Sequence, residues 1–328
     1  MSLLNKSQTV TKITPSSASS NVESTTSDIQ VPQDEYNTLK SLASEKGVET
    51  AWQYVKDTYG TDSPKQLEAH ELAHYVGKLI YEEKGLAGMT ICSTDFAFGC
   101  YHGLLDQAFR KDLSSLQQAE KACESVGIVK SGPYASCIHG IGHGIASYFK
   151  DNDLKNALKA CDKLPEGAPQ FCYDGVFMEF SRDAVDSFYR SDDPLYPCNA
   201  VDPKYTFACG RNQSSLLMSR MHLSYEEVAK TCQKSNDTNL KNSCFVALGF
   251  QAVYKANADP EKIITTCQTL NDKNFEYQCK SAAAGELIFQ DMTDWQVKSP
   301  KICNSLPKDK QNNCLGYIKN IENNYNRK

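Results

Sequence analysis

The sequence predicts an all-α fold made of about seven two-helix repeats, each of roughly 35 residues and each stapled by one disulfide. Three observations support this prediction. The 14 cysteines form pairs at a regular spacing, and helix-capping residues precede several of these pairs. A loop rich in proline and glycine, residues 164–169, also separates the two cysteines of one pair.

The cysteine spacing defines the repeat. The second cysteine of each pair recurs at steps of 37, 35, 37, 35, 35 and 35 residues, at Cys100, Cys137, Cys172, Cys209, Cys244, Cys279 and Cys314. The first cysteines are Cys92, Cys123, Cys161, Cys198, Cys232, Cys267 and Cys303. A fixed period in this range is typical of helical-repeat proteins.

Capping signals divide each repeat into two helices. A cap residue stands eight places before the first cysteine in four repeats, at Ser115, Asp153, Ser224 and Asp259. Ser224 is followed by Glu227 in a capping box, and Asp259 by Pro260 at the first helical position. We therefore expect the first cysteine to end one helix and the second cysteine to open the next.

Each cysteine pair is predicted to form a disulfide. A bridge across so short a loop would staple each helical hairpin and stabilise it by about 2–4 kcal/mol. The even count and the lack of any C-x-x-C motif favour disulfides in an oxidising compartment over zinc ribbons. The predicted bridges are Cys92–Cys100, Cys123–Cys137, Cys161–Cys172, Cys198–Cys209, Cys232–Cys244, Cys267–Cys279 and Cys303–Cys314.

The N-terminal region differs from the repeats. Residues 1–34 are rich in Ser and Thr without periodicity, which predicts a disordered linker. They contain no secretory signal, whereas the predicted disulfides indicate an oxidising compartment. We therefore expect an extracytoplasmic or secreted protein whose signal or anchor is not part of this sequence, rather than a protein that stays inside the cell with an unusual redox chemistry. Residues 35–91 are predicted to form N-terminal helices, one of which starts with Ser63-Pro64-Lys65-Gln66 and stops at Gly85. The repeats then occupy residues 92–328.

The sequence argues against nucleic-acid binding and against a transmembrane segment. The net charge of -5, with interspersed lysines and acids, provides no basic stripe for nucleic acid. No run approaches the roughly eighteen apolar residues of a transmembrane segment.

The repeats resemble the tetratricopeptide-type αα repeats over residues 92–320, through their period, helix pairing and cysteine placement. The resemblance implies a right-handed α-solenoid. It also implies a concave face that binds a peptide or protein partner. On this reading the protein is a non-enzymatic scaffold.

Histidines point to a metal centre. Two pairs, His70 with His74 and His139 with His143, are spaced four apart, so each pair shares one helix face. The position two places after the second cysteine is occupied by His102, His139 and Asp174 in the first three repeats, and equivalent positions of stacked repeats line one surface. These six residues are the predicted ligands. Imidazole and carboxylate would suit Zn, Fe, Cu or Mn, and with Asp106 and Glu179 nearby the ligand count allows a dinuclear centre.

The segment His70-Glu71-Leu72-Ala73-His74 resembles the zincin motif H-E-x-x-H, with Ile80 where metzincins have a third histidine. The resemblance implies a zinc peptidase in which Glu71 polarises the zinc-bound water. The reading from the residues alone is a metal-dependent enzyme, and it leaves hydrolysis and oxidation both open.

In the first three repeats a glycine directly follows the residue two places after the second cysteine, so that Gly103, Gly140 and Gly175 follow His102, His139 and Asp174. Glycine within a helix costs about 0.5–1 kcal/mol relative to alanine, so it needs a reason. Close helix packing and close approach of a ligand are the two explanations.

Overall fold

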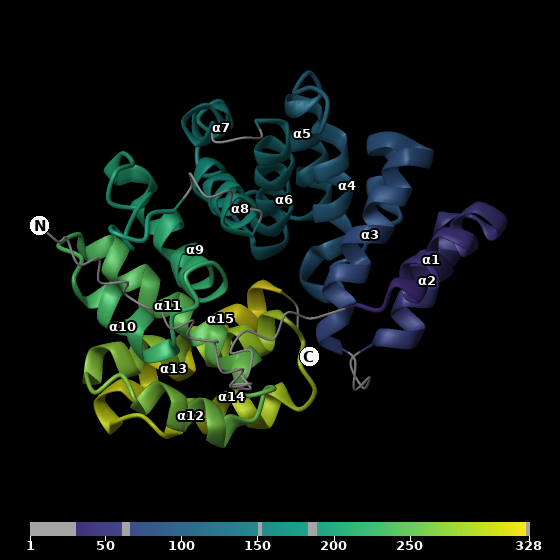
Figure 1. The fold of residues 1–328 in the computed structure, drawn as a ribbon. Coiled ribbons are helices and arrows are strands. Elements are labelled where there is room, and N and C mark those ends of the chain that lie inside the picture. The colour runs from purple at the N-terminus through teal and green to yellow at the C-terminus, as the bar shows by residue number, and fades with distance from the viewer. Residues whose placement is uncertain (1–30, 61–65, 150–152, 183–188, 326–328) are drawn as a thin grey trace, which may run out of the picture.

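The computed structural model describes residues 31–60, 66–149, 153–182 and 189–325. Most of the predicted linker, and the cap at Ser63-Pro64-Lys65, lie outside these residues. The described chain contains fifteen α-helices, three short 3₁₀-helices and no strand, which confirms the all-α prediction (Figure 1). None of the helices in these ranges is long and apolar enough to span a membrane.

Three helices precede the repeats: α1 (Gln33–Lys46), α2 (Val48–Tyr59) and α3 (Gln66–Lys84). The 3₁₀-helix η1 (Gly85–Thr90) follows α3, so α3 ends where the sequence predicts. Gly85 has a φ of 62°, a left-handed conformation that glycine adopts without strain.

The repeats consist of A helices, which carry the first cysteine, and B helices, which carry the second. The A helices are α5 (Leu116–Val126), α7 (Leu154–Cys161), α10 (Tyr225–Gln233), α12 (Pro260–Gln268) and α14 (Trp295–Asn304). The B helices are α4 (Gly99–Phe109), α6 (Gly132–Tyr148), α8 (Pro169–Arg182), α9 (Thr206–Ser219), α11 (Thr238–Lys255), α13 (Lys273–Phe289) and α15 (Lys308–Asn324).

The predicted caps occupy the N-cap positions of four A helices. Ser224 and Glu227 form the capping box, and the side chains of Asp153 and Asp259 accept hydrogen bonds from backbone N–H groups of the first turn. Ser115 stands at the N-cap of α5, but its side chain accepts no such bond.

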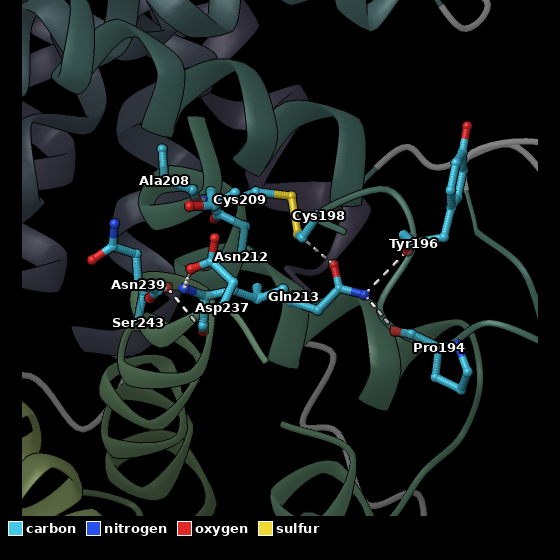
Figure 2. The surroundings of a disulfide bond; sticks show 12 residues. Pro194, Tyr196, Cys198, Ala208, Cys209, Asn212, Gln213, Asp237, Asn239 and Ser243 are labelled. Carbon is cyan, nitrogen blue, oxygen red and sulfur yellow. Dashed lines mark hydrogen bonds between the residues drawn. A yellow bond between two sulfur atoms is a disulfide. The ribbon is translucent and has the colours of Figure 1, made fainter. Parts of the chain in front are cut away.

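Two repeats depart from the predicted hairpin. Cys92 follows the 3₁₀-helix η1, and Cys198 lies in a run of turns before η3 (Pro203–Tyr205), so neither ends an α-helix. Around Cys198 the Gln213 side chain donates hydrogen bonds to the carbonyls of Pro194 and Tyr196, at 2.7 and 3.2 Å (Figure 2). These bonds hold the loop before Cys198 in place, whereas in five other repeats an A helix occupies this position.

All seven cysteine pairs are bonded as the spacing predicts, and no free cysteine remains. Their Cα–Cα distances lie between 5.4 and 6.0 Å, within the usual range. Every cysteine is buried. Each bridge therefore fixes its B helix to the segment that precedes it, and seven disulfides are typical of proteins in an oxidising, extracellular environment.

The B helices pack side by side in chain order and continue the row that α3 begins (Figure 1). The row curves until its last helix meets its first repeats. The Tyr325 ring lies 5.8 Å from the Phe98 ring and 5.2 Å from the Phe289 ring, and its hydroxyl lies 3.5 Å from the Ser136 hydroxyl. The C-terminal end of the array is therefore in contact with its first two repeats through Tyr325.

Glycines bring neighbouring helices of this row into backbone contact. A Cβ at Gly103 would lie 1.8 Å from the His74 carbonyl oxygen, and a Cβ at Gly175 would lie 2.0 Å from the His139 carbonyl oxygen. Close packing thus accounts for these glycines, and the helices they bring together are those that carry the histidines.

Candidate metal centre

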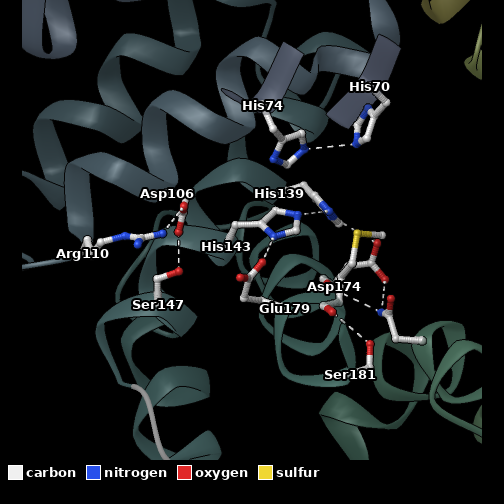
Figure 3. A network of polar contacts seen from close by, with 12 residues as sticks. His70, His74, Asp106, Arg110, His139, His143, Ser147, Asp174, Glu179 and Ser181 are labelled. Atoms are coloured by element: carbon white, nitrogen blue, oxygen red, sulfur yellow. Dashed lines mark hydrogen bonds and ion pairs between the residues drawn. The ribbon is translucent and has the colours of Figure 1, made fainter. Parts of the chain in front are cut away.

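Five imidazoles from three adjacent helices converge on one region: His70 and His74 from α3, His102 from α4, and His139 and His143 from α6 (Figure 3 shows the two pairs). Ring-centroid distances run from 4.7 Å between His70 and His74 to 5.8 Å between His70 and His102. The two pairs meet where the His74 ring lies 5.7 Å from the His143 ring. The sequence prediction of one histidine cluster therefore agrees with the geometry.

The α3 pair presents its ring nitrogens to one point. His70 Nδ1–H donates to the Phe96 carbonyl at 2.8 Å, so His70 Nε2 carries a lone pair. That nitrogen lies 3.1 Å from His74 Nε2. Phe96, Ala97 and Phe98 all have positive φ, between 49° and 67°. Strained backbone of this kind costs about 1–3 kcal/mol per residue, and here it supplies the carbonyl that orients His70.

The α6 pair is anchored by two carboxylates. His143 Nδ1–H donates to Glu179 at 2.7 Å, and His139 Nδ1 lies 3.3 Å from the Asp174 carboxylate. The Nε2 atoms of His139 and His143 face each other at 3.1 Å. Carboxylates bonded to the far nitrogen are the usual outer partners of metal-binding histidines, because they fix the tautomer and raise the basicity of the ligating nitrogen.

His102 lies between the two pairs. Its Nε2–H donates to the Ser136 carbonyl at 3.0 Å, which leaves a lone pair on Nδ1. Nδ1 is buried and has no hydrogen-bond partner. The ligand nitrogens of His70, His74 and His102 all lie within 4.8 Å of one another, so these three residues could hold one metal ion.

The donor set fits a transition-metal ion. When His139 and His143 both donate through Nδ1, the two facing Nε2 atoms carry only lone pairs, which repel each other unless a cation or proton lies between them. Their 3.1 Å separation is close to the roughly 3.3 Å that a tetrahedral ion at 2.0–2.1 Å imposes on two nitrogens. A bound cation would likewise provide a partner for the buried Nδ1 of His102, which has no hydrogen-bond partner.

Burial keeps the central imidazoles neutral. It lowers the pKa of His102 well below 6.5, and the charges of neighbouring histidines lower it further. Burial also lowers the pKa of His139, although Asp174 opposes the change. Burial acts to raise the pKa of Asp174, but Arg211 and His139 hold it below its usual value. Neutral imidazoles beside an ionised carboxylate are the protonation states that metal binding requires.

The predicted column of repeat-equivalent residues exists as a chain of contacts. The rings of His102 and His139 lie 5.2 Å apart, and His139 contacts Asp174. Asp174 in turn lies 3.5 Å from Arg211, which stands two places after Cys209 and so holds the equivalent position in the fourth repeat. Asp174, itself a predicted ligand, therefore contacts Nδ1 of His139, the ring nitrogen opposite the Nε2 that faces His143.

Asp106 does not join the cluster. Its carboxylate contacts Arg110 at 2.9 Å and accepts a hydrogen bond from Ser147, on the side away from the histidines (Figure 3). Lys78 lies 3.4 Å from the same carboxylate. Glu71 is half-buried on α3, the helix that carries His70 and His74. Burial is the main cause that raises the pKa of Tyr254 on α11, and the charge of Glu71 adds to it. Sequence reasoning missed the carbonyls of Phe96 and Ser136, which no side-chain pattern encodes.

Comparisons with protein-family models, with curated proteins and with solved structures find no match to this chain, so the tetratricopeptide and zincin resemblances remain those of repeat period and short motif.

Proposed function

We propose that the protein is a metal-dependent enzyme of an oxidising, extracytoplasmic compartment, with a His-rich centre that holds two transition-metal ions. His70, His74 and His102 are the ligands of one ion, and His139 and His143 those of the second. Phe96, Ser136, Asp174 and Glu179 fix the tautomers from outside. Seven disulfides support the compartment.

One observation carries this proposal. At His102, His139 and His143 one ring nitrogen donates to, or lies against, a carbonyl or carboxylate, and the other nitrogen is directed toward the cluster. A structural histidine needs only one such partner, whereas a ligand needs both an anchor and a free lone pair. Five imidazoles cannot fill the coordination of two ions, so positions remain for substrate or water. Ions bound in this way would supply Lewis-acid, water-activating or redox chemistry.

The test is elemental analysis of the purified protein, beside its absorption spectrum. We expect about two equivalents of one metal, and its colour decides between redox and Lewis-acid chemistry. His139→Ala combined with His143→Ala should remove one equivalent while the circular dichroism spectrum is unchanged. His222→Ala is the control, since His222 lies outside the cluster. A protein that takes up no metal after reconstitution would favour the scaffold reading instead.

A zinc peptidase is the second candidate, and the α3 pair favours it. His70 and His74 direct their Nε2 atoms to one point, as an H-E-x-x-H pair must, and Glu71 lies next to His70. In that case Glu71→Gln should abolish cleavage of a denatured protein substrate with metal still bound. Cleavage that survives this substitution would exclude the candidate.

A further inference from the structure

Arg211 continues the line of contacts that starts at the histidines. Its Nε lies 3.5 Å from Asp174 Oδ1, while the other oxygen of the same carboxylate lies 3.3 Å from His139 Nδ1. One carboxylate therefore separates the guanidinium from a proposed metal ligand. Arg211 is also close enough for its charge to lower the pKa of His139, where burial is the main cause.

The Arg211 guanidinium lies beside Asp174 but lacks hydrogen-bond partners among the described residues. Arg211 makes no hydrogen bond to the residues that the structure describes: its buried Nε lies 3.5 Å from Asp174 Oδ1, close enough for an ion pair but too far for a hydrogen bond. The guanidinium carbon lies over the Phe250 ring, 5.3 Å from the ring centroid, within the range of a cation–π contact. About a third of the side chain, 36%, remains exposed. A buried arginine normally uses its N–H donors in hydrogen bonds within the protein, whereas those of Arg211 make none to the described residues.

Glu286, the other acid whose charge acts on Arg211, has hydrogen-bond partners of its own. Glu286 accepts hydrogen bonds from Tyr254 at 3.0 Å and from Gln290 at 2.9 Å, and it forms no ion pair with Arg211. Tyr317 is within electrostatic reach of the guanidinium, because burial raises the pKa of this phenol and Arg211 lowers it. The surroundings thus offer Arg211 a partly dehydrated position beside Asp174.

We infer that Arg211 binds the carboxylate group of a small substrate, whose remaining part then reaches the metal ions. The inference rests on the proposed metal centre and names the class of substrate. The fork of a guanidinium matches the two oxygens of a carboxylate, which it binds through two parallel hydrogen bonds. Asp174 already offsets part of the charge of Arg211, so the guanidinium suits an anion with one negative charge better than phosphate with two, and a carboxylate is the favoured anion.

The test measures the binding of ¹³C-labelled acetate to protein loaded with Co²⁺ and to metal-free protein. Binding is followed through the line width of the acetate signal in the NMR spectrum. Arg211→Gln should weaken acetate binding by roughly ten- to hundredfold, because two charge-assisted hydrogen bonds are lost. Arg211→Lys should weaken it less. Arg190→Gln is the matched control, since it removes the same charge from an arginine that lies over Tyr196 at the surface. Metal content is measured in every sample.

Each outcome bears on one claim. Unchanged acetate binding in Arg211→Gln with normal metal content, or no acetate binding to the wild-type protein, would overturn the inference. Tighter binding of inorganic phosphate than of acetate would overturn the carboxylate assignment. If the wild-type protein takes up no metal, the proposed function fails. Acetate binding to the metal-free protein that depends on Arg211 would still support the anion site.

Discussion

Replacing Gly103 by alanine links the packing of the repeats to the geometry of the metal centre. Gly103 is the α4 residue next to His102, and it lies against the backbone of His74 on α3. The new Cβ would lie 1.8 Å from the His74 carbonyl oxygen, whereas ordinary contact begins at 3.4 Å. Because backbone atoms cannot turn aside, the two helices must separate locally by about 1.6 Å.

Two effects on stability oppose each other. Overpacking of a tight contact costs about 1–3 kcal/mol, and alanine returns about 1 kcal/mol of helix propensity. We expect a net loss of up to about 2 kcal/mol in the free energy of unfolding, measured by denaturant titration. The same shift moves His74 away from His102 by far more than the tolerance of about 0.2 Å on metal–ligand distances. Metal affinity, measured by competition with a chelator, should fall by about tenfold or more.

Gly316→Ala provides the control. Gly316 lies in α15, where an added Cβ would meet no atom within 4 Å. This variant should gain about 0.5–1 kcal/mol of stability and keep its metal affinity. If Gly103→Ala behaved like Gly316→Ala in both measurements, neither the packing argument nor its connection to the metal centre would hold.

Three further predictions concern the bridges, the contact between the array's ends and the anchoring carboxylates. Removing the Cys267–Cys279 bridge by substitution with alanine opens a loop of 12 residues and should lower the free energy of unfolding by about 3 kcal/mol in urea titration; no change would refute the stapling role. Tyr325→Ala should open the contact between the last helix and the first repeats, seen as a larger radius of gyration in X-ray scattering; an unchanged radius would show that the contact is not what closes the array. Glu179→Gln should lower metal affinity by about 10–100-fold in chelator competition with little change in melting temperature, since His143 loses its charged anchor; equal affinity would count against the proposed role of Glu179.

The repeat architecture could be predicted from sequence because its determinants are local. Caps such as Ser224 and Asp259 act within one helical turn, and cysteines about a dozen residues apart can meet only if the chain turns back on itself between them. The period then places equivalent residues on one surface, so the column of His102, His139 and Asp174 followed from alignment alone. Where no A helix forms, as before Cys198, the same local reasoning failed because Gln213 fixes the loop from another helix.

The tertiary structure decided what each of these residues does. Asp106 and Glu179 were equivalent candidates in the sequence, yet packing pairs Asp106 with Lys78 and Arg110 and directs Glu179 to His143. The carbonyls that orient His70 and His102 come from every residue type alike, so only the folded backbone selects them. The sequence by itself therefore determined the helical repeats, their bridges and the gathering of five histidines. Tautomers, outer partners and the exposed guanidinium of Arg211 depend on contacts between helices, which no spacing along the chain encodes.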